Sequence, residues 1–233
     1  MKRSLTFILF TLLLVGTLLV GCADSEAPAA PAAEVAQEEP VVPVAEGMRR
    51  FVVVPEETTA SYIVDEEFFK DALGKFDIPE GRVDTIGTTK EVEGELQLDI
   101  SDPTAIGPSR FAVNLESLTT DQALRDRWIR NNALESSTYP TAEFVVNAIE
   151  DGPANYTLGE EATFKLVGDM TIRDITRPAT FDVVATLEDD TARGVASAIM
   201  LMSDFGVEPP NFANTLTVAD EFEVQIDFVA REP

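Results

Sequence analysis

The side chains available for catalysis are almost all carboxylates. The chain has 42 aspartate and glutamate residues, no histidine and one cysteine, Cys22. Histidine is the commonest general base at neutral pH and the commonest metal ligand, so its absence excludes Ser-His-Asp and Cys-His catalysis and histidine-ligated zinc or haem. Carboxylate-pair hydrolysis and all-carboxylate metal sites are not excluded, but acid pairs occur by chance in so acidic a chain. We therefore predict a protein that is not an enzyme, with no catalytic residue, no metal and no cofactor.

Cys22 is placed for covalent lipidation. An apolar run over residues 5–21 follows Lys2 and Arg3 and is followed by polar residues, which is the layout of a secretory signal. The run is short for a membrane-spanning helix, which needs ~20 residues. Its last residues, Leu-Val-Gly before Cys22, resemble the lipobox of bacterial lipoprotein precursors, in which the signal is removed and the cysteine is acylated. The alternatives are an uncleaved membrane anchor and an ordinary signal peptide.

This resemblance predicts where the protein is found. We expect a lipoprotein signal peptide over 1–21, lipidation of Cys22, and a protein anchored outside the cytoplasm. The anchored protein would face the periplasm or the cell surface.

Residues 22–47 have the composition of an unstructured tether. They contain eight alanines, four prolines, six acidic residues and no basic residue, without apolar periodicity. Such a segment cannot bury enough apolar surface to fold, so we predict a disordered tether leading to one domain over 48–233. The alternative is a linker to another protein.

The charge of the chain limits its partners. Its formal net charge is −25, so nucleic acid and anionic membrane surfaces would be repelled. Contact with the bilayer must then come from the lipid anchor. The oligomeric state stays open.

From residue 48 onward the apolar residues alternate with polar ones, as expected for strands with one buried face. The apolar or alternating segments are 51–54, 62–64, 92–100, 111–115, 164–172, 179–187 and 222–228. Turn signals such as Asp151-Gly152-Pro153 separate them. Antiparallel strands at this spacing predict an all-β fold, either a sandwich or a barrel.

One segment breaks the strand pattern. Thr120 and Asp121 can cap a helix that runs to about Asn132, and Leu124 and Trp128 then lie four residues apart on one face. A lone helix among strands plugs or flanks the sheet. We interpret Trp128, the single tryptophan, as a packed core residue, with ligand contact as the alternative.

Five blocks resemble the YceI-like family in their order and spacing. They are Val92–Asp99, Phe111–Leu118, Arg125-Asp126 with Tyr139–Phe144, Gly168–Pro178 and Ser203–Gly206. The resemblance covers about residues 60–230. It implies an exported, lipocalin-like antiparallel β-barrel with one short helical insertion, which binds a long isoprenoid chain, such as a polyprenyl phosphate or an isoprenoid quinone, in an internal channel.

The implied channel wall is aromatic and methionine-rich, and methionine makes such a wall adaptable. The predicted ligand-binding residues are Phe111, Trp128, Phe144, Phe164, Met170, Met200, Met202 and Phe205.

The sequence departs from the family pattern at three places, and one of them bears on the ligand. Asp174 replaces a usual glycine, and Met202 stands where an arginine commonly precedes the Ser-Asp-Phe-Gly turn. The segment 51–89 matches poorly, with an insertion-like acidic run over 65–67. The missing arginine favours a neutral head group, as in a quinone, over a polyprenyl pyrophosphate. For Arg173 and Arg177, pairing with carboxylates is favoured over contact with a head group.

Periodicity does not distinguish a hollow barrel from one filled by its own side chains. The hollow barrel predicts a membrane-anchored isoprenoid carrier. The filled barrel predicts an adhesive or scaffolding domain that binds a protein partner. The third hypothesis is a carboxylate-based hydrolase. It ranks last, because no pair of acidic residues stands out from the others.

Overall fold

The structure is a computed structural model that describes residues 44, 47–102 and 105–233. The predicted signal peptide, its lipidated Cys22 and almost all of the predicted tether lie outside the described residues, so they stay predictions. Within the described ranges, no helix combines the length and the apolar character needed to cross a membrane.

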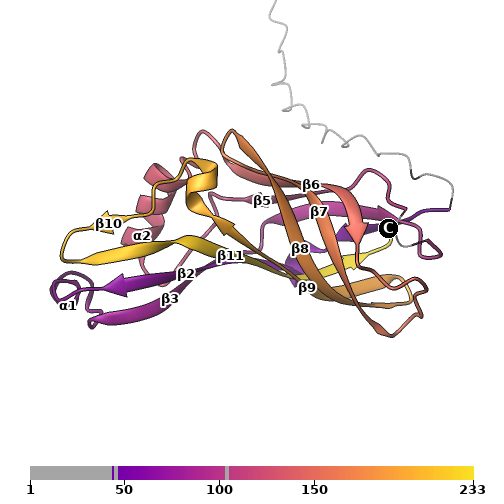
Figure 1. The fold of residues 1–233 in the computed structure, drawn as a ribbon, viewed down its shortest axis with the longest axis horizontal. Coiled ribbons are helices and arrows are strands. Elements are labelled where there is room, and N and C mark those ends of the chain that lie inside the picture. Colours follow the sequence, from indigo (N-terminus) through magenta and orange to yellow (C-terminus); the bar gives the residue numbers. More distant parts are fainter. Residues whose placement is uncertain (1–43, 45–46, 103–104) are drawn as a thin grey trace, which may run out of the picture. The chain divides into compact units, whose positions relative to one another are not determined.

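The alternating segments form a single antiparallel sheet of 11 strands in the described part of the chain. The strands are β1 (Arg49–Val53), β2 (Thr59–Phe68), β3 (Gly81–Thr89), β4 (Val92–Leu98), β5 (Arg110–Asn114), β6 (Thr141–Glu150), β7 (Glu161–Ile172), β8 (Ile175–Glu188), β9 (Thr191–Leu201), β10 (Asn211–Phe212) and β11 (Leu216–Arg231). Eight of them close into a barrel in the order β1-β4-β5-β6-β7-β8-β9-β11, because β11 pairs back with β1 (Figure 1). The predicted antiparallel β-barrel is confirmed.

Strand β11 joins the barrel to a second part of the sheet. On one edge it pairs with β9 from Glu221 to Arg231. On its other edge it pairs with β2 over residues 216–227, and then with β1 at Ala230 and Arg231. The strands β2, β3 and β10, with residues 216–220 of β11, therefore continue the sheet beyond the closed barrel (Figure 1). We call this region the wing.

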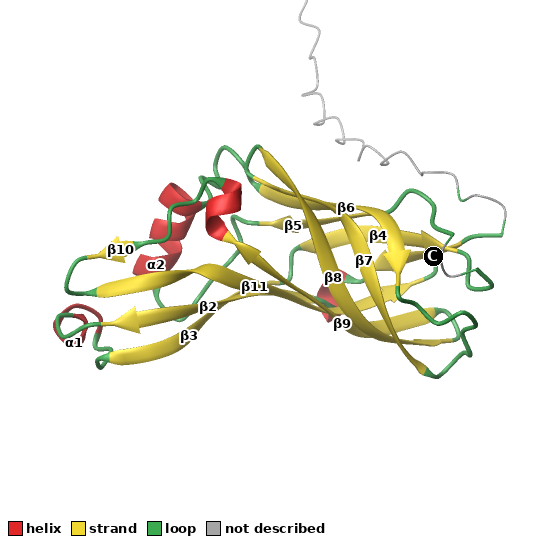
Figure 2. Cartoon of the chain, in the orientation of Figure 1, coloured by secondary structure: helices red, strands yellow, loops and turns green. Residues whose placement is uncertain are grey.

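Short helices accompany the strands. The helices and helical turns are η1 (Pro55–Glu57), α1 (Ala72–Phe76), α2 (Ala123–Trp128), the π-helical turn η2 (Ile129–Ala133) and η3 (Met202–Phe205). Figure 2 shows α1 and α2 at the end of the domain that carries β10. Helix α1 is fixed to the wing, because the Asp71 backbone N–H donates to the Asn214 carbonyl at 3.2 Å and Lys75 Nζ donates to the Thr215 hydroxyl at 2.6 Å.

Helix α2 begins later than the sequence predicts. We expected the cap at Thr120 and Asp121, but the first helical residue is Ala123 and Gln122 is the extended residue before it. The Thr120 hydroxyl donates to Asp126 Oδ1 at 2.6 Å, and the Thr120 backbone N–H donates to the same oxygen at 2.8 Å. The predicted position was wrong because Thr120 bonds the side chain of a helical residue and does not cap the free N–H groups of the first turn.

Close approach of two strands shapes the barrel core. Phe144 of β6 and Phe181 of β8 contact each other, with ring centroids 4.8 Å apart. On β7, a Cβ at Gly168 would lie 2.1 Å from the Val145 carbonyl oxygen and 2.9 Å from the Phe144 ring. Only glycine therefore lets β6 and β7 lie this close while the Phe144 ring keeps its place.

Candidate ligand-binding site

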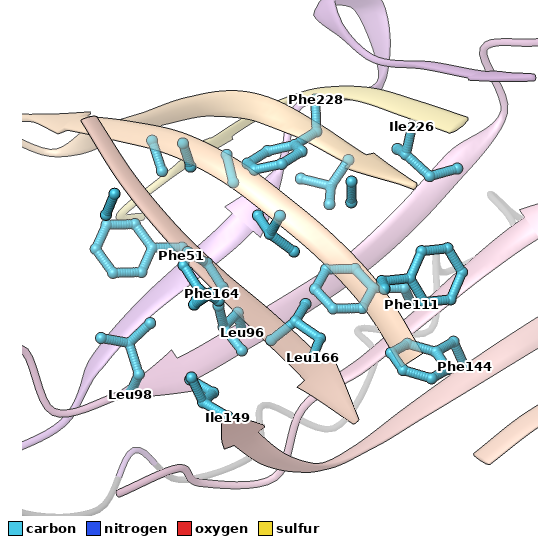
Figure 3. Close-up of a pocket in the computed structure, with 18 of the residues that line it drawn as sticks. Phe51, Leu96, Leu98, Phe111, Phe144, Ile149, Phe164, Leu166, Ile226 and Phe228 are labelled. Carbon is cyan, nitrogen blue, oxygen red and sulfur yellow. The ribbon is translucent and has the colours of Figure 1, made fainter. Parts of the chain in front are cut away.

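A narrow cavity of about 200 Å³ lies inside the barrel. Its wall includes the side chains labelled in Figure 3: Phe51, Leu96, Leu98, Phe111, Phe144, Ile149, Phe164, Leu166, Ile226 and Phe228. The Tyr156 hydroxyl, also in this wall, donates to the Glu160 carbonyl at 2.7 Å and accepts from the Leu187 N–H at 2.8 Å. Because that hydroxyl is already bonded, the narrow cavity offers a ligand mainly apolar contacts.

A wide cavity of about 480 Å³ lies between the wing and the segment that contains α2. Trp128 of α2 meets Phe212 of β10 edge to face, with ring centroids 5.7 Å apart and planes at 82°. Leu124 and Phe212 line this cavity and are also exposed at the surface. The wide cavity therefore has its mouth beside α2 and β10.

The two cavities adjoin each other. Five residues line both of them: Val113, Ala142, Met170, Val224 and Ile226. They come from four strands, β5, β6, β7 and β11. We call these five shared residues the ring; they lie where the two spaces meet, so the cavities are adjoining chambers.

An ion pair lies in the wall of the wide cavity. Glu66 of β2 is 4% exposed, and its Oε2 accepts a hydrogen bond from Arg125 Nη2 at 2.9 Å. Arg125 also pairs with Asp121 one turn earlier. Burial by itself lowers the pKa of Arg125, but the Glu66 and Asp121 carboxylates outweigh burial and raise that pKa above its ordinary value. The pair therefore joins α2 to the wing.

A buried hydroxyl accompanies the ion pair. The Tyr62 ring lies against β3, where a Cβ at Gly87 would come within 2.2 Å of it. Burial raises the pKa of the Tyr62 hydroxyl well above its ordinary value, so the group stays neutral. Its oxygen has no hydrogen-bond partner among the described residues. The wall of the wide cavity thus holds an ion pair and an unpartnered hydroxyl, whereas the wall of the narrow cavity has no charged side chain and its Tyr156 hydroxyl is already bonded.

No group of three or more histidine, cysteine, aspartate or glutamate side chains in the described part of the chain is arranged to hold an ion. Glu66 is held by Arg125. The arrangement is suited to binding an elongated apolar molecule with one more polar end.

Comparison with known proteins places this barrel in a family. The model of the YceI-like domain matches residues 51–230. The chain belongs to the YceI-like family. A UPF0312 protein of Pseudomonas putida is 30% identical over 133 residues, which are 53% of this chain and 64% of that protein. The match thus spans just under two thirds of that relative's length.

Solved structures show the same YceI-like fold. Burkholderia cenocepacia BcnA superposes with a TM-score of 0.57 at 18% identity, over 76% of this chain and 98% of that one. A polyisoprenoid binding domain from Saccharophagus degradans superposes with a TM-score of 0.57 at 10% identity, over 80% and 99%. At these identities the likeness is one of fold.

The YceI-like barrel brings most of the predicted ligand-binding residues onto the two cavities. Phe111, Phe144 and Phe164 line the narrow cavity, while Trp128, Met202 and Phe205 line the wide one. Met170 lines both. Met200 of β9 is buried in the same apolar core, but it is absent from both walls.

The charged part of the site was not among the predicted ligand-binding residues. The acidic run over 65–67 was expected to be insertion-like, whereas Glu66 lies on the inner face of β2 with Val64 and Phe68. The period of two could have revealed this, because Glu66 falls midway between those two apolar residues. Nothing in the sequence signals that Arg125 is its partner, since the two lie 59 residues apart.

Arg173 lies away from both cavity walls. Its guanidinium pairs with Glu135 and lies over the Tyr139 ring, 5.8 Å from the ring centroid. The preferred interpretation, pairing with a carboxylate, is confirmed for Arg173. It was wrong for Arg177, which donates to the Thr176 carbonyl at 3.0 Å and forms no ion pair with the described residues.

Proposed function

We propose that this YceI-like protein is a membrane-anchored extracytoplasmic binding protein that holds one long-chain isoprenoid lipid. The observation that carries the proposal is the pair of adjoining apolar cavities with an ion pair toward one end. The proposed activity is binding without chemistry, which makes the protein a carrier or a store. The family membership and the polyisoprenoid binding domain among its structural neighbours support this ligand class.

The two volumes support one orientation of the ligand. Ligand pockets commonly enclose about 300–1,000 Å³. The wide cavity of about 480 Å³ falls within that range, whereas the narrow one of about 200 Å³ is smaller. A slender isoprenoid tail suits the narrow, apolar space, and a bulkier head group suits the wide one. We therefore place the tail in the barrel and the head group beneath α2.

We propose a head group without charge, as in a quinone or a polyprenol. Arg125 already pairs with two carboxylates, those of Glu66 and Asp121, which would repel a phosphate. Lys75 lines the wide cavity from an exposed position and bonds the Thr215 hydroxyl. Met202, at the position where the family commonly has an arginine, offers this cavity a thioether and no charge.

We also propose that acylation of Cys22 supplies the membrane anchor. A single acyl chain holds a protein only marginally, while two or more chains form a stable anchor. The segment 22–47 would then keep the domain near the bilayer that supplies its ligand. The variant Cys22→Ser should leave the membrane fraction, or accumulate as an uncleaved precursor, with the ligand affinity of the domain unchanged. Membrane fractionation and a ligand titration would measure this.

The single tryptophan provides a direct test of ligand binding. Trp128 lines the wide cavity, so a bound quinone should quench its fluorescence. We expect decylubiquinone to quench the delipidated protein with a saturable isotherm, and the long polyprenol solanesol, which lacks the quinone ring, to reverse the quenching. Quenching that rises linearly, or that solanesol leaves unchanged, would contradict binding in the cavity. Native mass spectrometry that found only phosphorylated polyprenols would contradict the neutral head group.

A further inference from the structure

The ring between the two cavities contains one adaptable side chain. Its members are Val113, Ala142, Met170, Val224 and Ile226. Alanine has no side-chain rotamers, and the β-branched valines and isoleucine are stiff at χ1. Methionine is unbranched and has three rotatable bonds, so it can change shape without moving the backbone. Among these five residues, Met170 is therefore the one that can open or close the passage.

The backbone around Met170 is held firmly. Met170 lies within the long β7–β8 ladder, where it is paired with Arg177, and on the other side it is paired with Phe144 of β6. Its side chain is buried, with 7% of the residue exposed. A strand paired on both sides cannot shift easily, so any widening of the ring must come from the side chain.

We propose that Met170 is a gate between the two cavities and that it determines which isoprenoid chain lengths the protein binds. This inference rests on the proposed function. A short isoprenoid is held in the wide cavity alone, where Met170 is one wall contact among many and no passage between the cavities is needed. A long isoprenoid must place its tail in the narrow cavity, and for this the Met170 side chain must turn aside.

The substitution Met170→Ile tests the gate, because isoleucine has nearly the same volume but is stiff at χ1. The probes are farnesol and solanesol, two prenols that share a hydroxyl head and differ in chain length. We expect the dissociation constant of solanesol to rise about tenfold, the loss expected when about two methylene groups are no longer buried. Met170 also lines the wide cavity, so the constant for farnesol should rise as well, but by less than about threefold, and the ratio of the two constants should increase.

Met200→Ile is the matched control. Met200 is a second methionine of the core, 9% exposed, and it lies outside both cavity walls. Met200→Ile should lose about as much stability in urea denaturation as Met170→Ile does. The ratio of the solanesol and farnesol dissociation constants should stay at the wild-type value. The variant Met170→Ala gives a second measurement if Met170→Ile fails to fold. Removal of the Met170 side chain should speed solanesol association about threefold and change farnesol association by less.

Two results would overturn the gate while the proposed function stands: solanesol binding to Met170→Ile with the wild-type constant, or equal losses for both prenols. A wild-type protein that binds neither prenol would overturn the proposed function and the gate with it.

Discussion

The closed barrel and the wing use the same alternating strands but bury different side chains. Around the narrow cavity, the inner faces of the barrel strands are apolar. In the wing, the inner face of β2 carries Val64 and Phe68 together with Tyr62 and Glu66. The wing can bury a carboxylate because Arg125 of α2 pairs with it. The barrel thus depends on close packing of apolar groups, whereas the attachment of α2 to the wing depends on a specific charged contact.

The largest expected effect is on the packing of the barrel. In Gly168→Ala the new Cβ would meet the Val145 carbonyl oxygen at 2.1 Å, and a backbone atom cannot turn aside as a side chain can. We expect a loss of about 3 kcal/mol in the free energy of unfolding, measured by urea denaturation.

Gly74→Ala is the control for that substitution. Gly74 lies in α1, and a Cβ there meets nothing within 4 Å. Alanine should leave stability unchanged or raise it by up to about 1 kcal/mol, because alanine favours the helix. Equal losses in the two variants would show that the barrel is no more tightly packed than the end that carries the wing.

A smaller effect is expected at the charged contact of the wing. Arg125→Ala leaves the Glu66 carboxylate buried without its partner, which costs about 3–5 kcal/mol when both groups are fully buried. Because the Arg125 side chain is 15% exposed, we expect about 2 kcal/mol in thermal or urea unfolding. Arg127→Ala, on the exposed side of α2, should change stability by less than about 0.5 kcal/mol.

A double variant tests whether the contact between Arg125 and Glu66 acts through charge. The double variant Arg125→Met with Glu66→Leu replaces the ion pair by apolar groups and should recover most of the lost stability. If it were less stable than Arg125→Ala, the contact would hold the wing for a reason other than charge.

The smallest effect is expected at the mouth of the wide cavity. Leu124 is 57% exposed and lines this cavity, whereas Leu158 is 54% exposed and lies outside both cavity walls. Changing either to serine should alter stability by less than about 0.5 kcal/mol. Only Leu124→Ser should weaken decylubiquinone binding in the fluorescence titration, by about threefold through lost apolar contact. Equal binding by the two variants would place the mouth elsewhere.

The barrel was the more predictable of the two regions. In β7 and in the last part of β11 the apolar positions recur with a period of two, and the structure places strands there. The wing was less visible, because Tyr62 and Glu66 interrupt the apolar face of β2 and Gly87 leaves a gap in β3. The sharing of β11 between β1 and β2 depends on pairing between distant segments, which periodicity does not encode.

Met170 and Met200 show that periodicity has the same limit inside the barrel. Met170 and Met200 are both buried on inner faces, so alternation assigns them the same role. Their difference comes from the register of β7 and β9, which sets how far along the barrel each side chain lies. Register is fixed by the whole set of pairings and cannot be obtained from one strand.

The pairing of β1 with β11 has a consequence for how the domain folds. It joins Val53 to Ala230, two residues separated by nearly the whole domain, whereas β7 and β8 are joined by a tight turn between Ile172 and Ile175. Contacts between residues far apart in the chain cost more loop-closure entropy and form slowly. The β7–β8 hairpin can form during synthesis, but the barrel can close only after β11 has been made. Until then the apolar inner faces stay open, and the unfinished domain is at its most prone to aggregate or to need a chaperone.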